Sequence, residues 1–322
     1  MKNVHVQRYS DVNKQLWDEF VSQAEVHSIL FYRDFMEYHS HRFTDYSLLV
    51  FQENKLIAIM PANIDADNIL HSHQGLSYGG LVFKPFTYFA TRVSAFYELL
   101  RYLNSQDVAH LYLKAIPSSY TCDSSDKIIF HWLRSKNPRA DIYAYLPKGG
   151  YTKPNKDRNK YLKKAAKEKL EIRNFDDYAS FWANLLEPNL GKRFEVSPVH
   201  TSEEIELLAK KFPKQIQLFG AFQNGLLRAG IVLFIHKHVV HAQYIAGDDN
   251  RNDGSLDYLI DNVIKEFIGS HNFSFGSSSE EQGVCVNNGL LYWKESFGAC
   301  NDTQPYYAIE TKNYTLLENR LK

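Results

Sequence analysis

Two acid–base side chains follow apolar segments in the C-terminal half of the sequence and are candidates for exchanging a proton with a substrate. His241 lies within the run 238–246, and Glu280 follows the run 273–276 behind three serines. His and Glu often act as general bases, so either could deprotonate a reacting group. Two structural alternatives stay open: His241 as a core histidine with a satisfied hydrogen bond, and Glu280 as an acid that caps a helix.

A strand, a polar loop and a helix follow one another around His241. The alternation in 238–246 predicts a strand with His241 and Gln243 on one face and Tyr244 on the other. The loop 247–255 contains Gly254, and a helical pattern starts at Leu256. A loop that opens a helix can bind phosphate through its backbone N–H groups, although such a loop is often no more than a connection. Three acids near it would repel phosphate unless they are turned away: Asp248, Asp249 and Asp253.

The N-terminal half contributes a glycine-containing loop to a chain that has only 16 glycines. Gly75, Gly79 and Gly80 permit sharp turns or close approach of the backbone within residues 71–81. Three polar side chains of this loop are candidates for contacting a substrate: His73, Gln74 and Tyr78. A glycine-rich turn with local caps is the structural alternative.

Seven polar or charged residues crowd the predicted helix at 31–41 and its end. Arg33 and Glu37 are four residues apart and can pair with each other on the surface. Tyr38 and Arg42 have the same spacing on another face, where an arginine fork suits a diphosphate. Arg33, Tyr38, His39 and Arg42 are therefore candidate substrate contacts.

The charge of the chain is balanced overall but uneven along the sequence. The 37 Lys and Arg equal the 37 Asp and Glu, which argues against a dedicated nucleic-acid protein. Residues 151–173 nevertheless hold nine Lys or Arg and three acids. The pattern from Arg158 predicts a basic helix, either a solvated helix between domains or one that faces an anion.

The remaining reactive side chains give weaker signals. Cys122, Cys285 and Cys300 form neither a disulfide framework nor a zinc motif, and Cys285 has no histidine near it in sequence. No spacing predicts a metal site, with His236 and His238 as a remote possibility. Lys294 is a candidate contact for a phosphate or nucleotide, or one partner of a salt bridge.

The order of predicted elements suggests a duplicated α/β (α+β) unit. Helices, an antiparallel hairpin, a strand, a helix and a further strand occur in each half of the chain. Proline and glycine interrupt the chain at 147–160, so we expect domains at 1–150 and 151–322. Apolar runs are too short to span a membrane and the N-terminus does not look like a signal peptide. A cytoplasmic, reducing environment is expected.

Several segments together resemble one known family. They are residues 31–43, 71–81, 157–165, 240–247, 273–280 and 288–298. They look like the FemAB/FemX-like branch of the GNAT acyltransferase superfamily, and within it most like bacterial nucleotide-sugar N-acyltransferases. The similarity runs through nearly the whole chain. The phosphate loop departs from the family pattern, because Leu256 stands where a small residue is usual.

The resemblance implies tandem GNAT-like domains, each a mixed, mainly antiparallel sheet flanked by helices. It implies acyl-CoA as donor, without a metal, and a primary amine that attacks the thioester directly. His241 and Glu280 would be the proton acceptors. The donor would lie on the strand end and phosphate loop, at Ile245, Ala246, Arg251, Asn252, Gly254 and Ser255. The acceptor would meet the N-terminal candidates above together with Gln243, Tyr244 and Lys294.

We therefore expect an N-acyltransferase that acts on a nucleotide-linked amino sugar. The preferred acceptor is a dTDP-3-amino-3,6-dideoxyhexose used for O-antigen or another surface polysaccharide. One alternative is a FemX-like transferase that takes its acyl group from aminoacyl-tRNA and acts on peptidoglycan precursors. Another is a non-catalytic ligand-binding scaffold. Neither a nucleic-acid nor a membrane partner is favoured, and the sequence does not predict an oligomeric state.

Overall fold

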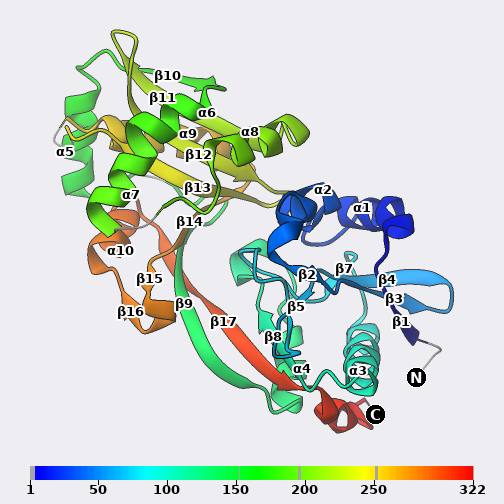
Figure 1. Cartoon of the computed structure of the whole chain (residues 1–322). Helices are drawn as coiled ribbons and strands as arrows, with labels where there is room; N and C mark the ends of the chain where they lie inside the picture. The colour runs from blue at the N-terminus through cyan, green and yellow to red at the C-terminus, as the bar shows by residue number, and fades with distance from the viewer. Residues whose placement is uncertain (1–3, 152, 195–196, 251–252, 322) are drawn as a thin grey trace. The chain divides into compact units, whose positions relative to one another are not determined.

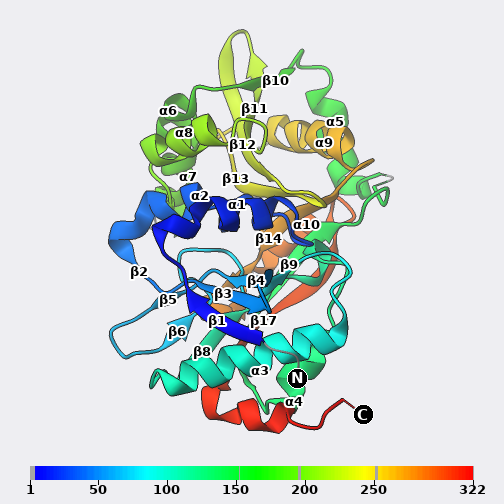
Figure 2. The same cartoon turned by 90° about the vertical axis from the view of Figure 1, so that its right-hand side faces the viewer.

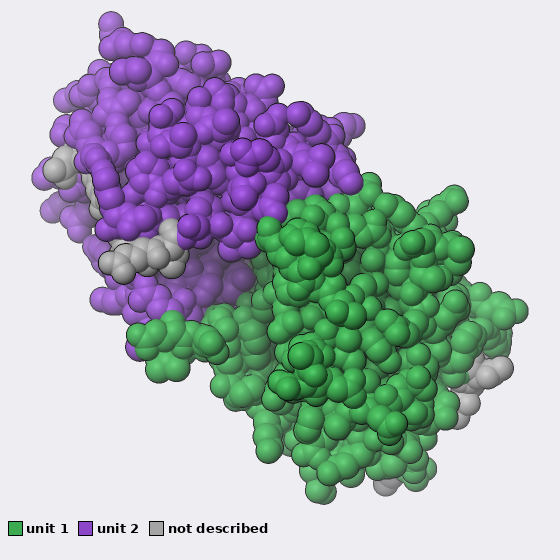
Figure 3. Space-filling model, in the orientation of Figure 1, with its two compact units in different colours: residues 1–141, 281–284, 303–322 green, residues 142–280, 285–302 purple. Residues whose placement is uncertain are grey.

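The computed structural model describes residues 4–151, 153–194, 197–250 and 253–321 (Figure 1). The chain forms two compact units (Figure 3). Unit 1 contains residues 1–141, 281–284 and 303–322, and unit 2 contains residues 142–280 and 285–302. The predicted domains at 1–150 and 151–322, with acceptor and donor roles, stay a prediction.

Unit 2 is built on a sheet in which most neighbours run antiparallel. Its strands follow the order β10 (Glu171–Phe175), β11 (Ile216–Gln223), β12 (Leu226–Ile235), β13 (Val239–Gly247), β14 (Asn272–Ser277) and β9 (Lys136–Leu146). Only the contact of β13 with β14 is parallel among these pairs. A short hairpin follows β14 and is formed by β15 (Ser279–Glu280) and β16 (Cys285–Val286).

Helices cover both faces of the unit 2 sheet. The helices are α5 (Lys156–Ala165), α6 (Tyr178–Phe181), α7 (Glu187–Phe194), α8 (Ser202–Lys211), α9 (Ser255–Phe267) and α10 (Asn288–Glu295). Ile260 and Ile264 of α9 pack with Ile231 of β12 in one core. Neighbouring residues of a strand face opposite sides of the sheet, so Gly230, which precedes Ile231, faces away from α9. There Gly230 lies against Phe181 of α6, which places α6 on the opposite face.

Unit 1 contains two groups of strands. One sheet has the order β1 (Val4–Arg8), β3 (Leu48–Gln52), β4 (Lys55–Met60) and β7 (Val82–Phe83). The other has the order β17 (Cys300–Glu310), β8 (His110–Lys114), β6 (Leu70–His71), β5 (Asn63–Ile64) and β2 (Thr44–Asp45). The helices are α1 (Lys14–Ser22), α2 (Arg33–Met36), α3 (Phe89–Ser105) and α4 (Asp126–Trp132). Helix α3 supplies much of the core and runs beside the C-terminal segment Thr311–Leu317 (Figure 2).

The expected mixed α/β fold, with mainly antiparallel sheets flanked by helices, is confirmed. Both predicted hairpins are present, as β3–β4 and β11–β12. The predicted basic helix is α5, and the strand–loop–helix order around His241 is β13 followed by α9. The sequence did not predict two long strands, β9 and β17. Polar residues and prolines interrupt the alternation of both, so their sequences lack a clean strand pattern.

Helix α8 has a capping box at its N-terminus that can be tested. Thr201 accepts a hydrogen bond from the Glu204 N–H, and the Glu204 carboxylate accepts one from the Thr201 N–H, which completes a capping box. We expect Thr201→Ala to lower the free energy of unfolding by about 1 kcal/mol, because it removes the cap. Urea unfolding measures this loss. Thr201→Ser keeps the hydroxyl and should retain most of the stability, and an equal loss in both variants would contradict the capping role.

Candidate functional site

Strands β13 and β14 part from each other after a short paired stretch. Val239–His241 pair in parallel with Asn272–Ser274, but no pair joins Ala242–Gly247 to the rest of β14. The register with β12 also shifts in this region. Val232 is opposite Tyr244 and Leu233 is opposite Ala242, so Gln243 is the extra residue of a β-bulge. The parting and the bulge leave the backbone of β13 open toward β14.

A cavity of about 550 Å³ lies where the two strands part. It is large enough for a small-molecule ligand. Its walls come from β13, β14, α10, the start of α9 and Arg158 of α5. Residues that line it include Ala242, Gln243, Ile245, Ala246, Gly247, Gly254, Ser255, Leu256, Phe275, Ser277, Leu290, Trp293 and Lys294. All of them belong to unit 2.

The N-terminus of α9 opens into this cavity. Gly254 is its N-cap, with φ +84°, and gives the helix no side-chain cap. Ser255 is buried and lines the cavity, and its hydroxyl has no hydrogen-bond partner among the residues that the structure describes. The first N–H groups of a helix and its positive dipole end favour an anion. Of the predicted cofactor contacts, Ile245, Ala246, Gly254 and Ser255 line the cavity, and Arg251 and Asn252 lie outside the described residues.

The acids near this helix end are held by arginines. Arg228 forms ion pairs with Asp248 and with Asp253, the latter at 2.6 Å. Arg158 pairs with Asp257, whose second oxygen accepts a hydrogen bond from Trp293 Nε1 at 3.0 Å. These pairs neutralise the carboxylates that would otherwise repel an anionic ligand. Asp249 instead pairs with Lys192 at the surface, at 2.8 Å.

Lys294 lies on α10 and is buried against the end of β14. Its Nζ donates to the backbone oxygens of Gly276 at 3.0 Å and Ser277 at 2.6 Å. Burial lowers the pKa of Lys294 to about 7, and no carboxylate among the described residues forms an ion pair with it. The salt bridge that the sequence left open is absent there. Near neutral pH the side chain can therefore take up or release a proton inside the cavity wall.

His241 and Glu280 lie in different surroundings, and neither lines the cavity. His241 Nδ1 is 3.2 Å from the Ser274 hydroxyl on β14. Burial, and next to it the charge of Lys294, lower the pKa of His241 to about 4, so its ring is neutral at pH 7. Glu280 is exposed on β15, where its carboxylate accepts a hydrogen bond from Asn287 Nδ2 at 2.8 Å. Their catalytic roles stay predictions.

Gln243 and Tyr244 are neighbours with different environments. Gln243 lines the cavity, whereas Tyr244 is buried on the other side of the strand, as the alternation predicts. The Tyr244 hydroxyl is 2.5 Å from His200 Nδ1, and its ring packs edge-on against Trp182. Burial raises the pKa of Tyr244 to about 12. These contacts fix Tyr244 within the packing of unit 2.

In unit 1, two predicted substrate contacts take part in internal packing. The buried guanidinium of Arg33 pairs with Glu37 at 3.0 Å and Asp45 at 3.4 Å, and lies over the Tyr9 ring. The i, i+4 pair considered from the sequence is therefore present. Tyr78 is buried, and its hydroxyl lies 2.9 Å from the Ser28 hydroxyl. A ligand role for either residue remains a prediction.

The two predicted acceptor segments of unit 1 meet each other. The ring of His39 stacks on Tyr38 at 4.3 Å and lies 5.3 Å from His73. A Cβ on Gly75 would come within 2.2 Å of His39, so only glycine fits there. Arg42 and Gln74 are exposed beside this cluster, and Gln74 accepts a hydrogen bond from the Asn63 amide at 2.8 Å.

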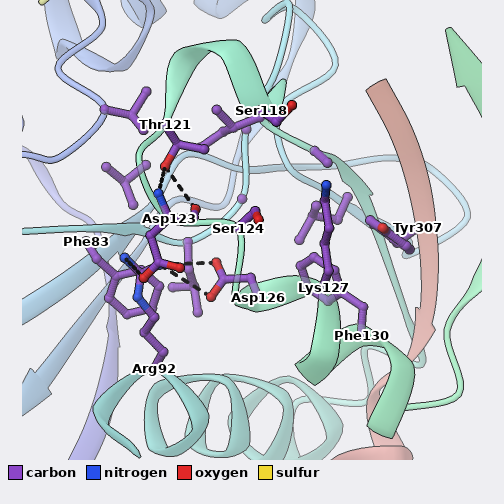
Figure 4. Close-up of a pocket in the computed structure, with 18 of the residues that line it drawn as sticks. Phe83, Arg92, Ser118, Thr121, Asp123, Ser124, Asp126, Lys127, Phe130 and Tyr307 are labelled. Atoms are coloured by element: carbon purple, nitrogen blue, oxygen red, sulfur yellow. Dashed lines mark hydrogen bonds and ion pairs between the residues drawn. The ribbon is translucent and has the colours of Figure 1, made fainter. Parts of the chain in front are cut away.

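Unit 1 also contains a cavity, and ion pairs fill most of it (Figure 4). Arg92 of α3 pairs with Glu25 at 2.6 Å and with Asp123 and Asp126 at 3.3 Å. Burial raises the pKa of Asp126 to about 6, although Arg92 acts against this shift. About 70 Å³ of space remains there. The charged side chains of this region pair with each other, and they leave little open space for a ligand.

Comparisons with known proteins show which solved structures have a similar fold. No family model matches the sequence, and no curated protein matches it. The crystal structure of FemX is similar at 10% identity with a TM-score of 0.68, over 98% of this chain and 99% of that one. A tandem GNAT protein from the clavulanic acid biosynthesis pathway is similar at 9% identity and TM-score 0.52, over 96% and 99%. L-PGS from Bacillus licheniformis is similar at 11% identity and TM-score 0.56, over 85% and 86%.

The chain has a tandem GNAT-like fold. This agrees with the fold that the sequence resemblance implied, and at these identities the likeness concerns the fold. Among the described residues, no cluster of three or more His, Cys, Asp or Glu is arranged to hold a metal ion. No helix in the described ranges is both long and apolar enough to cross a membrane.

The close approach of α5 to the start of α9 can be tested at Gly254. A Cβ there would lie 2.5 Å from the backbone oxygen of Tyr161, and φ is +84°. We expect Gly254→Ala to lower the free energy of unfolding through both the left-handed backbone and this clash, by roughly 1–3 kcal/mol beyond the backbone cost. Urea unfolding measures the loss.

Gly225 supplies a matched control in the β11–β12 turn. Its φ is +81°, and nothing lies within 4 Å of its added Cβ. Gly225→Ala therefore carries the backbone cost without the clash. Equal losses of stability in the two variants would contradict the tight contact between Gly254 and α5.

Proposed function

We propose that the chain is an acyltransferase whose donor site is the cavity between β13 and β14. The observation that carries this proposal is the parting of the two strands beside the N-terminus of α9, whose N-cap Gly254 has no side chain. An open strand edge offers N–H and C=O groups to an extended amide-containing chain. The helix N-terminus, at the end of the same cavity, offers donors for a phosphate.

The shape and polarity of the cavity support acyl-CoA as the donor. The edge from Ala242 to Gly247 can pair with the amides of the pantetheine arm, next to the apolar side chain of Phe275. The pyrophosphate would meet the Ser255 hydroxyl and the N–H groups of α9 that follow Ser255, since the Ser255 N–H itself donates to Asp253 Oδ1 at 2.8 Å. The predicted contacts Arg251 and Asn252 fall outside the described residues and stay predictions.

The chemistry requires a proton acceptor for the amine. An ammonium acceptor first loses a proton to a base, and the neutral amine then attacks the thioester carbonyl carbon. The C–N bond forms, the C–S bond breaks, and the thiolate takes the second proton from the nitrogen. The first proton stays on the base until it passes to solvent, so the products are an amide and a thiol.

Lys294 is placed to be that base, although the sequence suggested only a phosphate or nucleotide contact. A neutral amine has two N–H groups and one lone pair. The oxygens of Gly276 and Ser277 account for both N–H groups, which leaves the lone pair to accept a proton. Because Lys294 lines the cavity and has a pKa of about 7, it suits this task better than the exposed Glu280. The charge of Lys294 in turn helps to lower the pKa of His241.

The bulge at Gln243 supplies a candidate for stabilising the oxyanion. The extra residue of a bulge is left out of the ladder, so its backbone N–H is available to a ligand. A fixed N–H donor near the reacting carbonyl lowers the energy of the tetrahedral state.

For the acceptor we propose the amine of a nucleotide-linked amino sugar, preferably a dTDP-3-amino-3,6-dideoxyhexose for a surface polysaccharide. The support is the sequence resemblance together with the polar and aromatic cluster of unit 1. The test is a thiol-release assay of the full chain across acyl-CoAs and amino-sugar nucleotides. Release with none of the pairs would overturn the proposal.

A second candidate is transfer of an aminoacyl group from aminoacyl-tRNA. Two observations favour it: the similarity to FemX over nearly both whole chains, and seven exposed lysines on and around α5. These lysines are 153, 156, 160, 163, 164, 167 and 169. Saturable CoA binding by calorimetry without retention of tRNA on a filter supports the first candidate, and the reverse result supports the second.

Substitution of Lys294 tests the proposed base. We expect Lys294→Met and Lys294→Arg to lower kcat at pH 7 at least about 100-fold, because neither side chain can accept a proton. Steady-state kinetics with the acyl donor that proves active measures this effect. Lys237→Met, at an exposed lysine of the same unit, is the matched control and should keep the wild-type rate. Loss in Lys294→Met alone would point to the positive charge instead of the base.

The pH dependence gives an independent check. The lowered pKa of Lys294 means that its active, neutral form dominates above about pH 7 and is lost as pH falls. The wild-type rate should therefore fall about tenfold per pH unit below that point. This fall of the rate at low pH should be absent in Lys294→Met. If the rate of the variant still falls in the same way, Lys294 is not the titrating base.

A further inference from the structure

One face of the unit 1 sheet carries polar and aromatic side chains instead of core residues. Leu111 and Leu113 of β8 are buried in the core of unit 1. Strand alternation puts Tyr112 and Lys114 on the opposite face. Directly opposite partners in a sheet share a face, so Tyr306 of β17 lies beside Lys114, and His71 of β6 beside Tyr112.

A cavity of about 850 Å³ lies over this face. It is separate from the ion-pair cavity around Arg92, and the two share only the apolar or aromatic residues Leu113 and Tyr307. Its lining brings together strand residues, the loop after β6 and the turn around Gln282. The residues are His71, Ser72, His73, Gln74, Tyr112, Leu113, Lys114, Pro138, Arg139, Glu281, Gln282, Val284, Tyr306 and Tyr307.

Lys114 contributes a cation with unused donors. Its Nζ donates one hydrogen bond, to the Leu76 oxygen at 2.7 Å, and no carboxylate among the described residues forms an ion pair with it. Burial, and after it the charge of Arg139, lower the pKa of Lys114 to about 8. The ammonium form still dominates at pH 7. The charge of Asp141, which pairs with Arg139, acts against this shift. An anion in the cavity would supply a further acceptor and a countercharge of its own.

Arg139 and Tyr306 form a fixed flat surface beside Lys114. The Arg139 guanidinium lies 4.4 Å from the centre of the Tyr306 ring. Asp141 accepts from Arg139 at 3.0 and 2.8 Å and from the Tyr306 hydroxyl at 3.0 Å, which holds both groups in place. Tyr112 adds a ring that is 38% exposed. Rings of this kind stack on a base or pack on a sugar.

His73 is a strained residue in the wall of the same cavity. It is 4% exposed and has φ +66°, a conformation that non-glycine residues seldom adopt. Within the described part of the chain, its Nδ1 has no hydrogen-bond partner. Burial, followed by nearby positive charge, lowers the pKa of His73 to about 3, so the ring is neutral. A buried polar atom without a partner is costly unless a ligand or water satisfies it.

We infer that this cavity binds an anionic ligand with a planar ring, of the chemical class of a nucleoside diphosphate. Lys114 binds the phosphate, Tyr112 and Tyr306 contact the ring or sugar, and His73 hydrogen-bonds to the ligand. The identification of this ligand as part of the amine acceptor rests on the proposed function. The binding itself does not require any transfer reaction.

Calorimetric titration of the full chain with dTDP, without acyl donor, tests the inference. We expect saturable binding that Lys114→Met weakens at least about tenfold, because a charge-assisted contact is lost. Lys114→Arg keeps the charge and should retain most of the affinity, which separates a local loss from misfolding. Lys55→Met, at an exposed lysine that begins β4, should bind as wild type does.

Ligand fragments separate the two halves of the cavity. Tyr112→Leu should weaken dTDP at least about threefold while leaving inorganic pyrophosphate unchanged, because pyrophosphate has no ring to stack. No saturable binding of dTDP or UDP, or equal dTDP affinity in Lys114→Met and wild type, overturns the inference. Binding of pyrophosphate as tight as that of dTDP overturns the role of the ring.

The two proposals fail in different ways. If wild type releases thiol but Lys114→Met binds dTDP normally, this cavity is not the nucleotide site and the proposed function stands. If wild type binds dTDP through Lys114 but releases thiol with no pair of substrates, the binding site stands and the proposed function fails.

Discussion

The candidate site of unit 2 depends on the short pairing of β13 with β14, which joins three residues of each strand. Backbone N–H and C=O groups must be satisfied, and the remainder of β13 has no partner strand on that side among the described residues. Water can satisfy this edge, and an extended ligand can do so by adding to it. The other walls of the cavity follow from the same parting, because α9 and α10 flank the opening and bring a helix end and Lys294 to it.

The second requirement is charge balance around the helix end. Asp248, Asp253 and Asp257 would make this region negative if they stood alone. Arg228 and Arg158 bind them from β12 and α5. The Ser255 N–H donates to Asp253 Oδ1 at 2.8 Å, so the N–H groups that follow it in the first turn of α9 are the ones open to an anion. This pairing explains how a chain without net charge can still favour anionic ligands locally. It also gives the basic segment around α5 a structural role through Arg158, in addition to any contact that its exposed lysines make.

Local patterns predicted the elements well and the site only in part. The alternation around His241 correctly placed Gln243 and Tyr244 on opposite faces, and the capping box at Thr201 is present. The proposed role of Lys294 as a base was not predicted from the sequence, because its lowered pKa comes from burial, which depends on residues distant in sequence. The same limit applies to Lys114, whose neighbours on β17 and β9 are far along the chain. No short sequence motif marks Lys294 or Lys114 as a functional residue.

The two units show how one order of elements can support different chemistry. In unit 2, β13, α9 and β14 follow one another around a cavity of about 550 Å³. In unit 1, β7, α3 and β8 follow in the same order, but Arg92 at the start of α3 and its three carboxylates leave about 70 Å³. A buried arginine with paired acids is stable only while the set stays complete, so this region cannot be opened without exposing an uncompensated charge. Unit 1 therefore offers ligands a different surface, the outer sheet face with Lys114, where a cation and aromatic rings lie outside the core.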